Sequence, residues 1–301
     1  MYSRMLVLLD GSAMSEVVFS YARELAGRLC LDLDLFHACP EHEADQLPMR
    51  QAYIDHATEQ LQADSSAIHD RTCPDDDRTL TVSSKVVVGY PAEEIVKYSQ
   101  DNDIDLIMLA THGRSGIRRW GIGSVADKVI HAATVPVWLV PSHLHEGIID
   151  DTIPNQRLLV PLDGSKMAET VLPHIITLAE QRGVNTEVML INVIPPSSDS
   201  VVNPEKIFKR EDISSFKTRG EVYLMEIEER LEKAGIKASS EQLVGDAAEE
   251  IVRYAAETGP RLIVMSTHGR SGFSRFVFGS VAENVLRRLQ KTPMLLVRPQ
   301  E

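Results

Sequence analysis

The hexapeptide THGRSG occurs twice in this chain of 301 residues, at Thr111–Gly116 and at Thr267–Gly272, 156 positions apart. Each copy follows an apolar run, and each is followed by a Gly-Ser-Val tripeptide that starts at Gly123 or at Gly279. An internal repeat decides the architecture of a chain before any local propensity does. The two copies therefore predict that one fold is built twice.

The repeat extends over almost the whole sequence. MLVLLDGSAMSE at 5–16 matches LLVPLDGSKMAE at 158–169, and VGYPAEEIVKY at 88–98 matches VGDAAEEIVRY at 244–254. The closing segments TVPVWLVP and TPMLLVRP also correspond. The offset changes only from 153 at the first aspartate to 156 at the glycine, so the copies differ by small loop insertions.

The length of the chain agrees with two domains, since a single core seldom grows this large. We predict domains at residues 1–142 and 157–301. Residues 143–156, which are polar and contain Gly and Pro, are predicted to be the linker between them.

Short apolar runs alternate with amphipathic stretches in each copy. Met5–Leu9 and Leu106–Leu109 have the length of buried strands, and TRGEVYLMEIEERLEKAG is typical of a long helix that ends at Gly235. Strands separated by helices predict parallel pairing with right-handed crossovers. Each copy is therefore predicted to be an open α/β sandwich with an about five-stranded parallel sheet, and ligands bind such sheets at the carboxyl ends of the strands.

The composition limits the function classes. A formal net charge of −13 argues against a general affinity for nucleic acid or anionic membranes. Three cysteines, an odd number without a CxxC pair, indicate a reducing compartment, and we expect a cytoplasmic protein. We expect neither a signal peptide nor a membrane span, because no apolar run reaches the required length.

The repeated hexapeptide begins where a buried strand is predicted to stop. Its glycines allow close approach of the backbone, its arginine adds positive charge, and the Gly-Ser that follows is predicted to open a helix. The free N–H groups and the positive dipole end of that helix would face the same space. This combination predicts a phosphate cradle, and the absence of any Gly-Lys dipeptide excludes a P-loop.

The full pattern in each copy is a small residue, two spacers, a glycine, nine spacers and Gly-Ser. Its members are Ala110, Gly113, Gly123 and Ser124 in the first copy, and Ser266, Gly269, Gly279 and Ser280 in the second. With LVPLDGS, the segment around AEEIV and the closing TPMLLVRP, this pattern resembles the universal stress protein family over nearly the whole chain. The chain is similar to two such domains in tandem.

The resemblance implies a Rossmann-like fold of the adenine nucleotide alpha hydrolase-like type. It implies binding of ATP or another adenine nucleotide, with Mg²⁺ on the phosphates, in a nucleotide-dependent regulator of the stress response. It also implies that the last strand of each half pairs two domains, giving an internal pseudo-dimer and allowing a homodimer.

The predicted nucleotide sites contain seven residues in each half. They are Asp10, Ala110, Gly113, Arg114, Gly123, Ser124 and Val125, and then Asp163, Ser266, Gly269, Arg270, Gly279, Ser280 and Val281. The resemblance places the aspartates at the nucleoside and the glycine loops at the phosphates. It places adenine against the backbone near Ala38 and Val193.

The sequence departs from the family pattern at two places. Ala110 and Ser266 stand where the motif has its first glycine, and Leu8 stands where the second copy has the more family-like Pro161. A Cβ at the first glycine position narrows the turn.

Other interpretations of the same residues stay open. Asp10 and Asp163 could cap a helix or shape a turn, and His112 and His268 could bond to nearby backbone. Neither histidine is accompanied by a matched acid or nucleophile in the sequence, and the H-x-H of the linker offers only two metal ligands. The sequence therefore indicates a binding protein with at most slow ATP hydrolysis. The alternatives are an interaction module that binds no nucleotide and a weak ATPase.

Overall fold

The computed structural model describes residues 2–113, 122–142, 144, 156–180, 185–195, 210–269, 278–289 and 291–299, with side chains from residue 219 onward in the segment that begins at 210. The chain divides into two compact units. The first contains the described residues up to 144 together with Pro293–Arg298, and the second contains most of the remainder. Arg114 and Arg270 lie outside the described residues.

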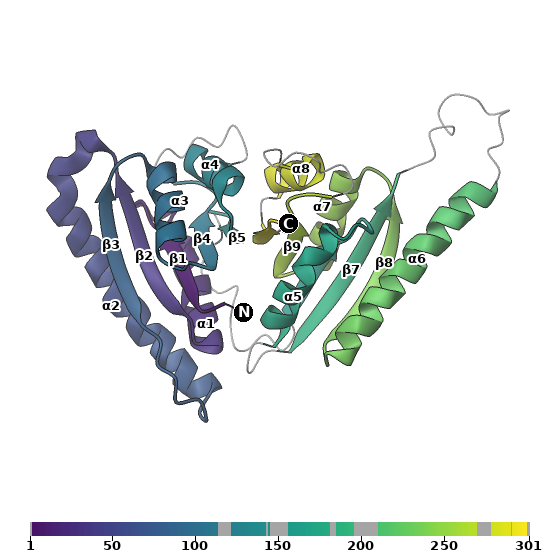
Figure 1. Ribbon diagram of the computed structural model, residues 1–301, viewed down its shortest axis with the longest axis horizontal. Helices are drawn as coiled ribbons and strands as arrows, with labels where there is room; N and C mark the ends of the chain where they lie inside the picture. Colours follow the sequence, from purple (N-terminus) through teal and green to yellow (C-terminus); the bar gives the residue numbers. More distant parts are fainter. Residues whose placement is uncertain are drawn as a thin grey trace. The chain divides into compact units, whose positions relative to one another are not determined.

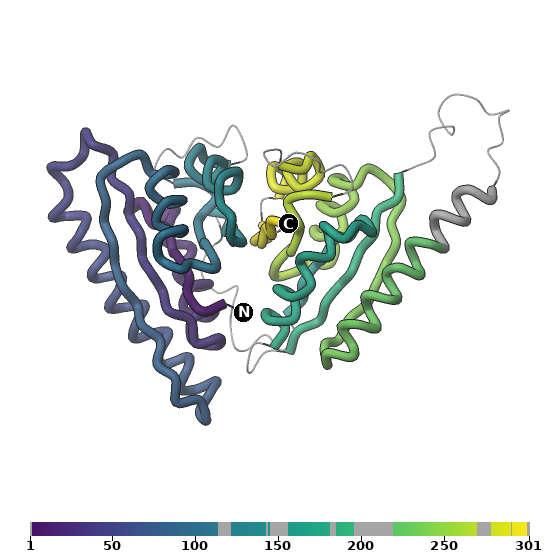
Figure 2. The backbone as a smooth tube through the Cα atoms, in the orientation of Figure 1, coloured from purple at the N-terminus to yellow at the C-terminus, as the bar shows by residue number. Residues whose placement is uncertain are grey.

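The first unit contains five parallel strands in the order β3-β2-β1-β4-β5. The strands are β1 (Arg4–Leu8), β2 (Asp32–Cys39), β3 (Val82–Val88), β4 (Leu106–Ala110) and β5 (Val137–Val140). The helices are η1 (Glu16–Val18), α1 (Phe19–Leu29), η2 (Glu41–Gln46), α2 (Leu47–Thr72), α3 (Pro91–Asp101) and α4 (Ser124–Ala132). Helix α1 packs on α2, and α3 packs on α4. The chain starts in the middle of its sheet, as the purple end of the tube in Figure 2 shows.

The second unit repeats this order with four parallel strands, β9-β6-β7-β8. The strands are β6 (Gln156–Pro161), β7 (Thr186–Ile194), β8 (Lys237–Val244) and β9 (Leu262–Ser266). The helices are η4 (Ala168–Val171), α5 (Leu172–Ala179), α6 (Arg210–Lys233), α7 (Ala247–Thr258) and α8 (Ser280–Arg288). The long helix α2 runs beside β3, and α6 runs beside β8 in the same way (Figure 1).

The last strand of the chain does not belong to the same compact unit as the rest of its repeat. Strand β10 (Met294–Val297) pairs antiparallel with β5, with Leu295 opposite Trp138, and it belongs to the first compact unit. The first compact unit therefore contains six strands, of which one comes from the end of the second repeat. The resemblance implied that the last strand of each half pairs two domains. The strands β5 and β10 pair with each other and cover backbone groups that would otherwise be exposed.

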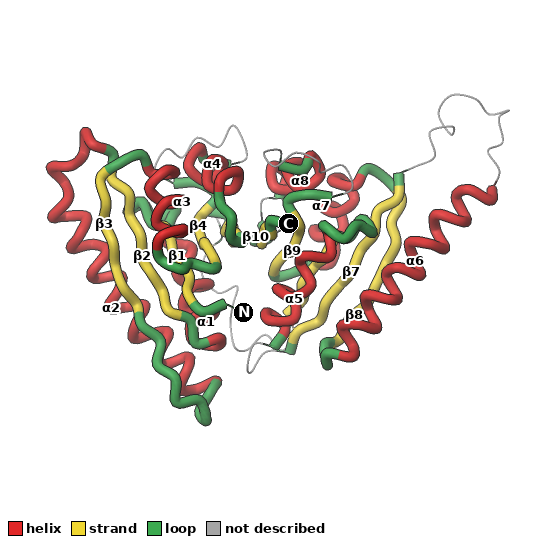
Figure 3. The backbone as a smooth tube through the Cα atoms, in the orientation of Figure 1, coloured by secondary structure: helices red, strands yellow, loops and turns green. Residues whose placement is uncertain are grey.

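Burial explains why these segments form central strands. Met5, Leu6 and Val7 of β1 have no exposed surface, and all five residues of β4 and of β9 are buried. Strands that are covered on both faces need such continuous apolar runs. Figure 3 shows the yellow strands of each unit accompanied by red helices. The predicted α/β architecture with two repeated domains is confirmed.

The predicted domain limits stay a prediction, although β6 already begins at Gln156, the last residue of the predicted linker. Within the described part of the chain, no helix is both long and apolar enough to cross a membrane.

Candidate functional site

A cavity opens at the carboxyl end of the parallel strands in each unit. The cavity of the first unit has a volume of about 280 Å³ and that of the second about 250 Å³. The described residues at each strand-to-helix crossing thus leave an open space between them. Twelve of the predicted site residues line the two cavities: Asp10, Ala110, Gly113, Gly123, Ser124 and Val125 in the first, and Asp163, Ser266, Gly269, Gly279, Ser280 and Val281 in the second. Whether a ligand touches them stays a prediction.

The aspartate after the first strand forms part of a tight turn in both units. One carboxylate oxygen of Asp10 accepts hydrogen bonds from the backbone N–H of Ser12, at 3.0 Å, and from its hydroxyl, at 2.6 Å. In the second unit, Asp163 accepts from the backbone N–H of Ser165 at 2.9 Å. Gly11 and Gly164 between them have φ of 77° and 84°, which a side chain would strain. The turn-shaping interpretation thus applies to the Oδ1 oxygen of each aspartate.

The second oxygen of the same carboxylate faces the glycine loop. A Cβ added to Gly113 would lie 2.0 Å from Oδ2 of Asp10, and one added to Gly269 would lie 2.4 Å from Oδ2 of Asp163. A side chain at either glycine would collide with the carboxylate. Because both positions are glycines, the backbone of the loop can approach the carboxylate closely. Oδ2 therefore lies next to the loop backbone on one side of the cavity.

The helix that follows the glycine loop presents its N-terminus to the cavity. Gly123 and Gly279 are the N-caps of α4 and α8, and Ser124 and Ser280 are the first helical residues. The N–H groups of the two glycines donate to the carbonyls of Thr111 and Thr267, at 2.7 and 2.8 Å. These two amides close the loop, and the phosphate contact assigned to the glycines from the sequence stays a prediction.

The amides available to an anion belong to the first turn of each helix, immediately after the N-cap glycine. The first intrahelical bonds run from Asp127 to Gly123 and from Glu283 to Gly279, at 2.9 Å each. The three N–H groups before each donor, at residues 124–126 and 280–282, have no acceptor within the helix, and all six residues line the cavities. Together with the helix dipole, they favour an anionic group at this end.

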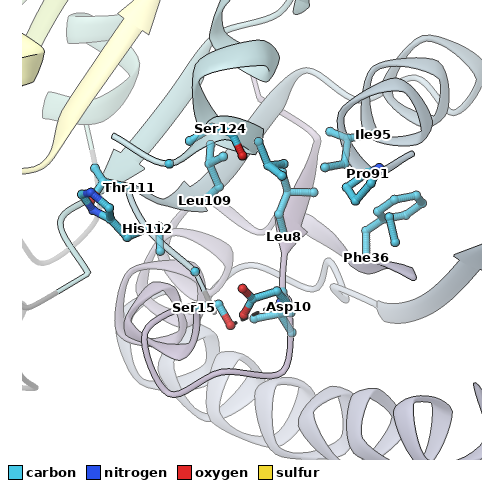
Figure 4. Close-up of a pocket in the computed structure, with 17 residues that line it drawn as sticks. Leu8, Asp10, Ser15, Phe36, Pro91, Ile95, Leu109, Thr111, His112 and Ser124 are labelled. Carbon is cyan, nitrogen blue, oxygen red and sulfur yellow. Dashed lines mark hydrogen bonds between the residues drawn. The ribbon is translucent and has the colours of Figure 1, made fainter. Parts of the chain in front are cut away.

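The opposite end of each cavity is apolar. Phe36, Pro91 and Ile95 line it in the first unit, and Figure 4 shows their side chains gathered away from Asp10 and Ser124. Ile191, Ala247 and Ile251 take the matching places in the second unit. Ala38 and Val193, which sequence reasoning placed at the base, also line the cavities. The sequence analysis missed the three apolar residues of each wall, although the strand and helix patterns that carry them were visible.

The histidines of the repeated hexapeptide bond to a neighbouring side chain. Nδ1 of His112 lies 3.2 Å from the hydroxyl oxygen of Thr111, and Nδ1 of His268 lies 2.9 Å from that of Thr267. The interpretation that these histidines bond to nearby backbone stays a prediction. In Figure 4 the His112 ring lies next to Thr111, on the far side of the cavity from Phe36.

The segment after each turn is tied to the long helix of its unit by an acid at a matched position. Glu16 accepts from the hydroxyl of Tyr53 in α2 at 2.9 Å, and burial raises the pKa of that Tyr53. Glu169 binds Arg230 of α6 at 2.8 Å. Burial opposes ionisation of Glu169, but Arg230 and Lys166 together hold its pKa below the usual value. The carboxylate of Glu169 is thus kept charged.

The described residues contain no group of three or more His, Cys, Asp or Glu side chains that could hold a metal ion. Each cavity therefore combines one carboxylate oxygen, one apolar wall and one helix N-terminus. Such an arrangement can bind an elongated ligand with an apolar end, hydroxyl groups in the middle and an anionic tail.

Comparison with known proteins agrees with the repeat. The family model described as "Universal stress protein family" matches residues 1–141 and again 154–298. A universal stress protein of Mycobacterium tuberculosis is 29% identical over 226 residues, which cover 74% of this chain and 70% of that protein. A universal stress protein of Mycolicibacterium smegmatis is 23% identical over 310 residues and is covered to 96%.

Solved structures share the fold over the whole chain. A putative universal stress protein from Pseudomonas aeruginosa gives a TM-score of 0.70 at 15% identity, with 99% of this chain and 94% of that chain covered. A universal stress protein from Archaeoglobus fulgidus gives 0.66 at 20% identity, with coverage of 99% and 97%.

Proposed function

The chain belongs to the universal stress protein family, and we propose that it binds ATP or another adenine nucleotide in each of its two cavities and acts as a nucleotide-dependent regulator. One observation carries this proposal. In both units, an apolar wall, a carboxylate oxygen and a helix N-terminus line the same cavity, and they correspond to the base, ribose and phosphates of a nucleotide.

Each part of the cavity suits one part of the ligand. The purine would lie against Phe36 and Ile95 in the first unit, next to the backbone of Ala38. The ribose hydroxyls would donate to Oδ2 of Asp10, while Oδ1 remains with Ser12. The phosphates would accept from the free amides at the start of α4, where the helix dipole favours negative charge.

Magnesium would reach the site with the phosphates. Mg²⁺ is usually held by one or two carboxylates, by water and by substrate phosphates, and it rarely needs a cage made of protein alone. Asp10 and Asp163 are the carboxylates that line the cavities. The three cysteines are free thiols, which supports our proposal of a cytoplasmic protein.

Titration calorimetry with ATP and Mg²⁺ tests the proposal on four proteins and one control variant. Wild type should bind two nucleotides, Gly113→Glu and Gly269→Glu one each, and the double variant none, because a side chain at either glycine meets the carboxylate. Met225→Glu adds the same charge at an exposed position of α6 and should bind like wild type. Equal binding of ATP by wild type and all variants would contradict the proposal.

A second function is supported by a specific departure. Ala110 and Ser266 carry a Cβ where the motif has glycine, and the amides of Gly123 and Gly279 are already engaged by the backbone. Both features suit an interaction module that binds no nucleotide. Such a protein would show no thermal shift on addition of ATP and no nucleotide absorbance after purification.

A further inference from the structure

The residue immediately before each site aspartate is held by the neighbouring strand in an unusual way. The N–H of Leu9 donates to the Phe36 carbonyl at 3.0 Å, and the N–H of Leu162 donates to the Ile191 carbonyl at 2.8 Å. These are ordinary parallel-ladder bonds. In a regular ladder, the carbonyl of the same residue would next accept from the N–H two positions further along the partner strand, at Ala38 or at Val193.

A side chain takes the place of that amide in both units. The Leu9 carbonyl lies 2.9 Å from Nδ1 of His37, and the Leu162 carbonyl accepts from the side-chain amide of Asn192 at 2.7 Å. His37 and Asn192 occupy matched positions of β2 and β7, and both are buried, with 2% and 3% exposure. Two chemically different residues thus supply the same donor at the same point.

The substitution determines what the next residue of the strand can do. Cys39 and Ile194 face the outer strand, since their carbonyls accept from Gly89 at 2.9 Å and from Gly245 at 3.0 Å. Backbone groups alternate in direction along a strand, so the N–H and C=O of the preceding residue face the other way. For Ala38 and Val193, that direction is the cavity that each of them lines.

We propose that His37 and Asn192 are positioning residues for base recognition. By bonding to the Leu9 and Leu162 carbonyls, they release the backbone N–H of Ala38 and Val193 to a purine edge. They also fix the backbone that carries Asp10 and Asp163. The inference rests on the proposed nucleotide function, to which it adds the source of base selectivity.

Each positioning side chain is oriented by a partner behind it. Nε2 of His37 lies 2.8 Å from Nη1 of Arg50, and Nη2 of the same guanidinium donates to Gln46 and Glu43. A guanidinium only donates, so Nε2 accepts and the proton sits on Nδ1, facing Leu9. In the second unit, Oδ1 of Asn192 accepts from Gln242 at 3.1 Å, which turns its NH₂ group toward Leu162.

The selectivity of each site provides the test. The first experiment uses a Gly269→Glu background, in which only the first site is expected to bind. There, His37→Leu removes the side-chain donor, so the N–H of Ala38 is expected to donate to the Leu9 carbonyl instead. We expect ATP to bind about tenfold more weakly, as for the loss of one buried hydrogen bond, while inorganic triphosphate binds as before. His37→Asn, which copies the second unit, should restore ATP binding.

The second site offers the mirror experiment in a Gly113→Glu background. Asn192→Leu should weaken ATP about tenfold without affecting triphosphate, since again only the base contact is lost. Nitrogen-15 NMR of the nucleotide-free protein should show the His37 ring as the neutral Nδ1–H tautomer, which a purely space-filling role does not require.

Two results would overturn the inference while leaving nucleotide binding intact. One is that His37→Leu weakens the binding of ATP and of inorganic triphosphate equally, or weakens the binding of neither. The other is an Nε2–H tautomer of His37. Failure of wild type to bind ATP would instead remove the proposed function, and the inference with it.

Discussion

The two cavities are built on one plan, but their walls differ. Both have the Asp-Gly-Ser turn, the Thr-His-Gly strand end and the Gly-Ser-Val helix start. They differ in the side chains of the walls. Six residues of the first unit correspond in the repeat to six different residues of the second: Leu8 to Pro161, Ser15 to Ala168, Phe36 to Ile191, Pro91 to Ala247, Leu109 to Met265 and Ala110 to Ser266. The matching parts are those that set backbone geometry, so the cavity depends on the backbone and one carboxylate more than on particular walls.

The support behind the cavities differs most in charge. The first unit places the guanidinium of Arg50 between His37 and Glu43, and Arg50 is 3% exposed. Among the described side chains of the second unit, the matching support consists of the uncharged amides of Asn192 and Gln242. A buried charge is costly once its partners are lost, whereas an amide costs much less. The same backbone contact is therefore maintained at different risk to stability.

The largest expected effect comes from breaking the charged support. Arg50→Leu leaves Glu43 and His37 without their common donor, and we expect the first unit to lose about 3 kcal/mol of unfolding free energy. Gln242→Leu is the matched change in the second unit and should cost only about 1 to 2 kcal/mol, since it takes a donor from the uncharged Asn192 oxygen. Urea unfolding of both variants measures the contrast, and similar losses would contradict it.

A smaller effect tests the close approach of loop and carboxylate. Gly113→Ala places a methyl group on Asp10, and Gly269→Ala places one on Asp163. Each should weaken ATP about thirtyfold, or roughly 2 kcal/mol, at its own site only. Titration of each variant with ATP resolves the two sites, and the untouched site of the same molecule is the control. A loss shared by both sites would argue against local collision.

Acid should affect the second unit more than the first. Burial lowers the pKa of His174 from 6.5 to about 4, and Tyr21 takes its place in the first unit. The unfolded chain therefore binds a proton that the folded chain resists, so stability is present above pH 6.5 and falls as the pH drops toward 4. Allowing for its half-buried position, we expect a loss of about 1 kcal/mol.

The variant His174→Tyr, which copies the first unit, should remove this part of the pH dependence. Thermal unfolding between pH 7 and about 4 measures it. An unchanged pH profile in the variant would show that other groups cause the acid loss.

The smallest expected effect comes from restoring the first glycine of the motif. Ala110→Gly removes the Cβ that narrows the turn and should strengthen ATP binding about twofold at the first site, against a stability cost of up to about 1 kcal/mol. Ser266→Gly should gain less, because the Ser266 hydroxyl accepts from the N–H of His268 at 3.3 Å. Weaker binding in Ala110→Gly would mean that the Cβ contacts the ligand.

Much of this architecture could be predicted from the sequence, because the repeat carried it. The spacing from Ala110 to Ser124 predicted a loop between a strand end and a helix start, and β4 ends at Ala110 while α4 begins at Ser124. The buried run at Met5–Leu9 likewise predicted the first strand, which spans Arg4–Leu8.

The rest depends on contacts that spacing does not encode. Nothing in the sequence distinguishes the amide of Gly123, which bonds to Thr111, from that of Ser124, which is left over by helix geometry. The role of His37 depends on where β1 ends relative to β2, a matter of register. The pairing of β10 with β5 joins the closing strands of the two copies. The family resemblance implied that these strands pair, but local patterns alone cannot specify the partner.

The pairing of β5 with β10 has a consequence during synthesis. About 150 residues separate the two strands along the chain, and a ribosome needs about 10 s or more to add them at typical rates. Until then the first half of the nascent protein has a bare β5, and a β5 or β10 from a neighbouring chain on the same messenger RNA could pair with it. The yield of correctly closed molecules should therefore depend on how densely ribosomes are loaded.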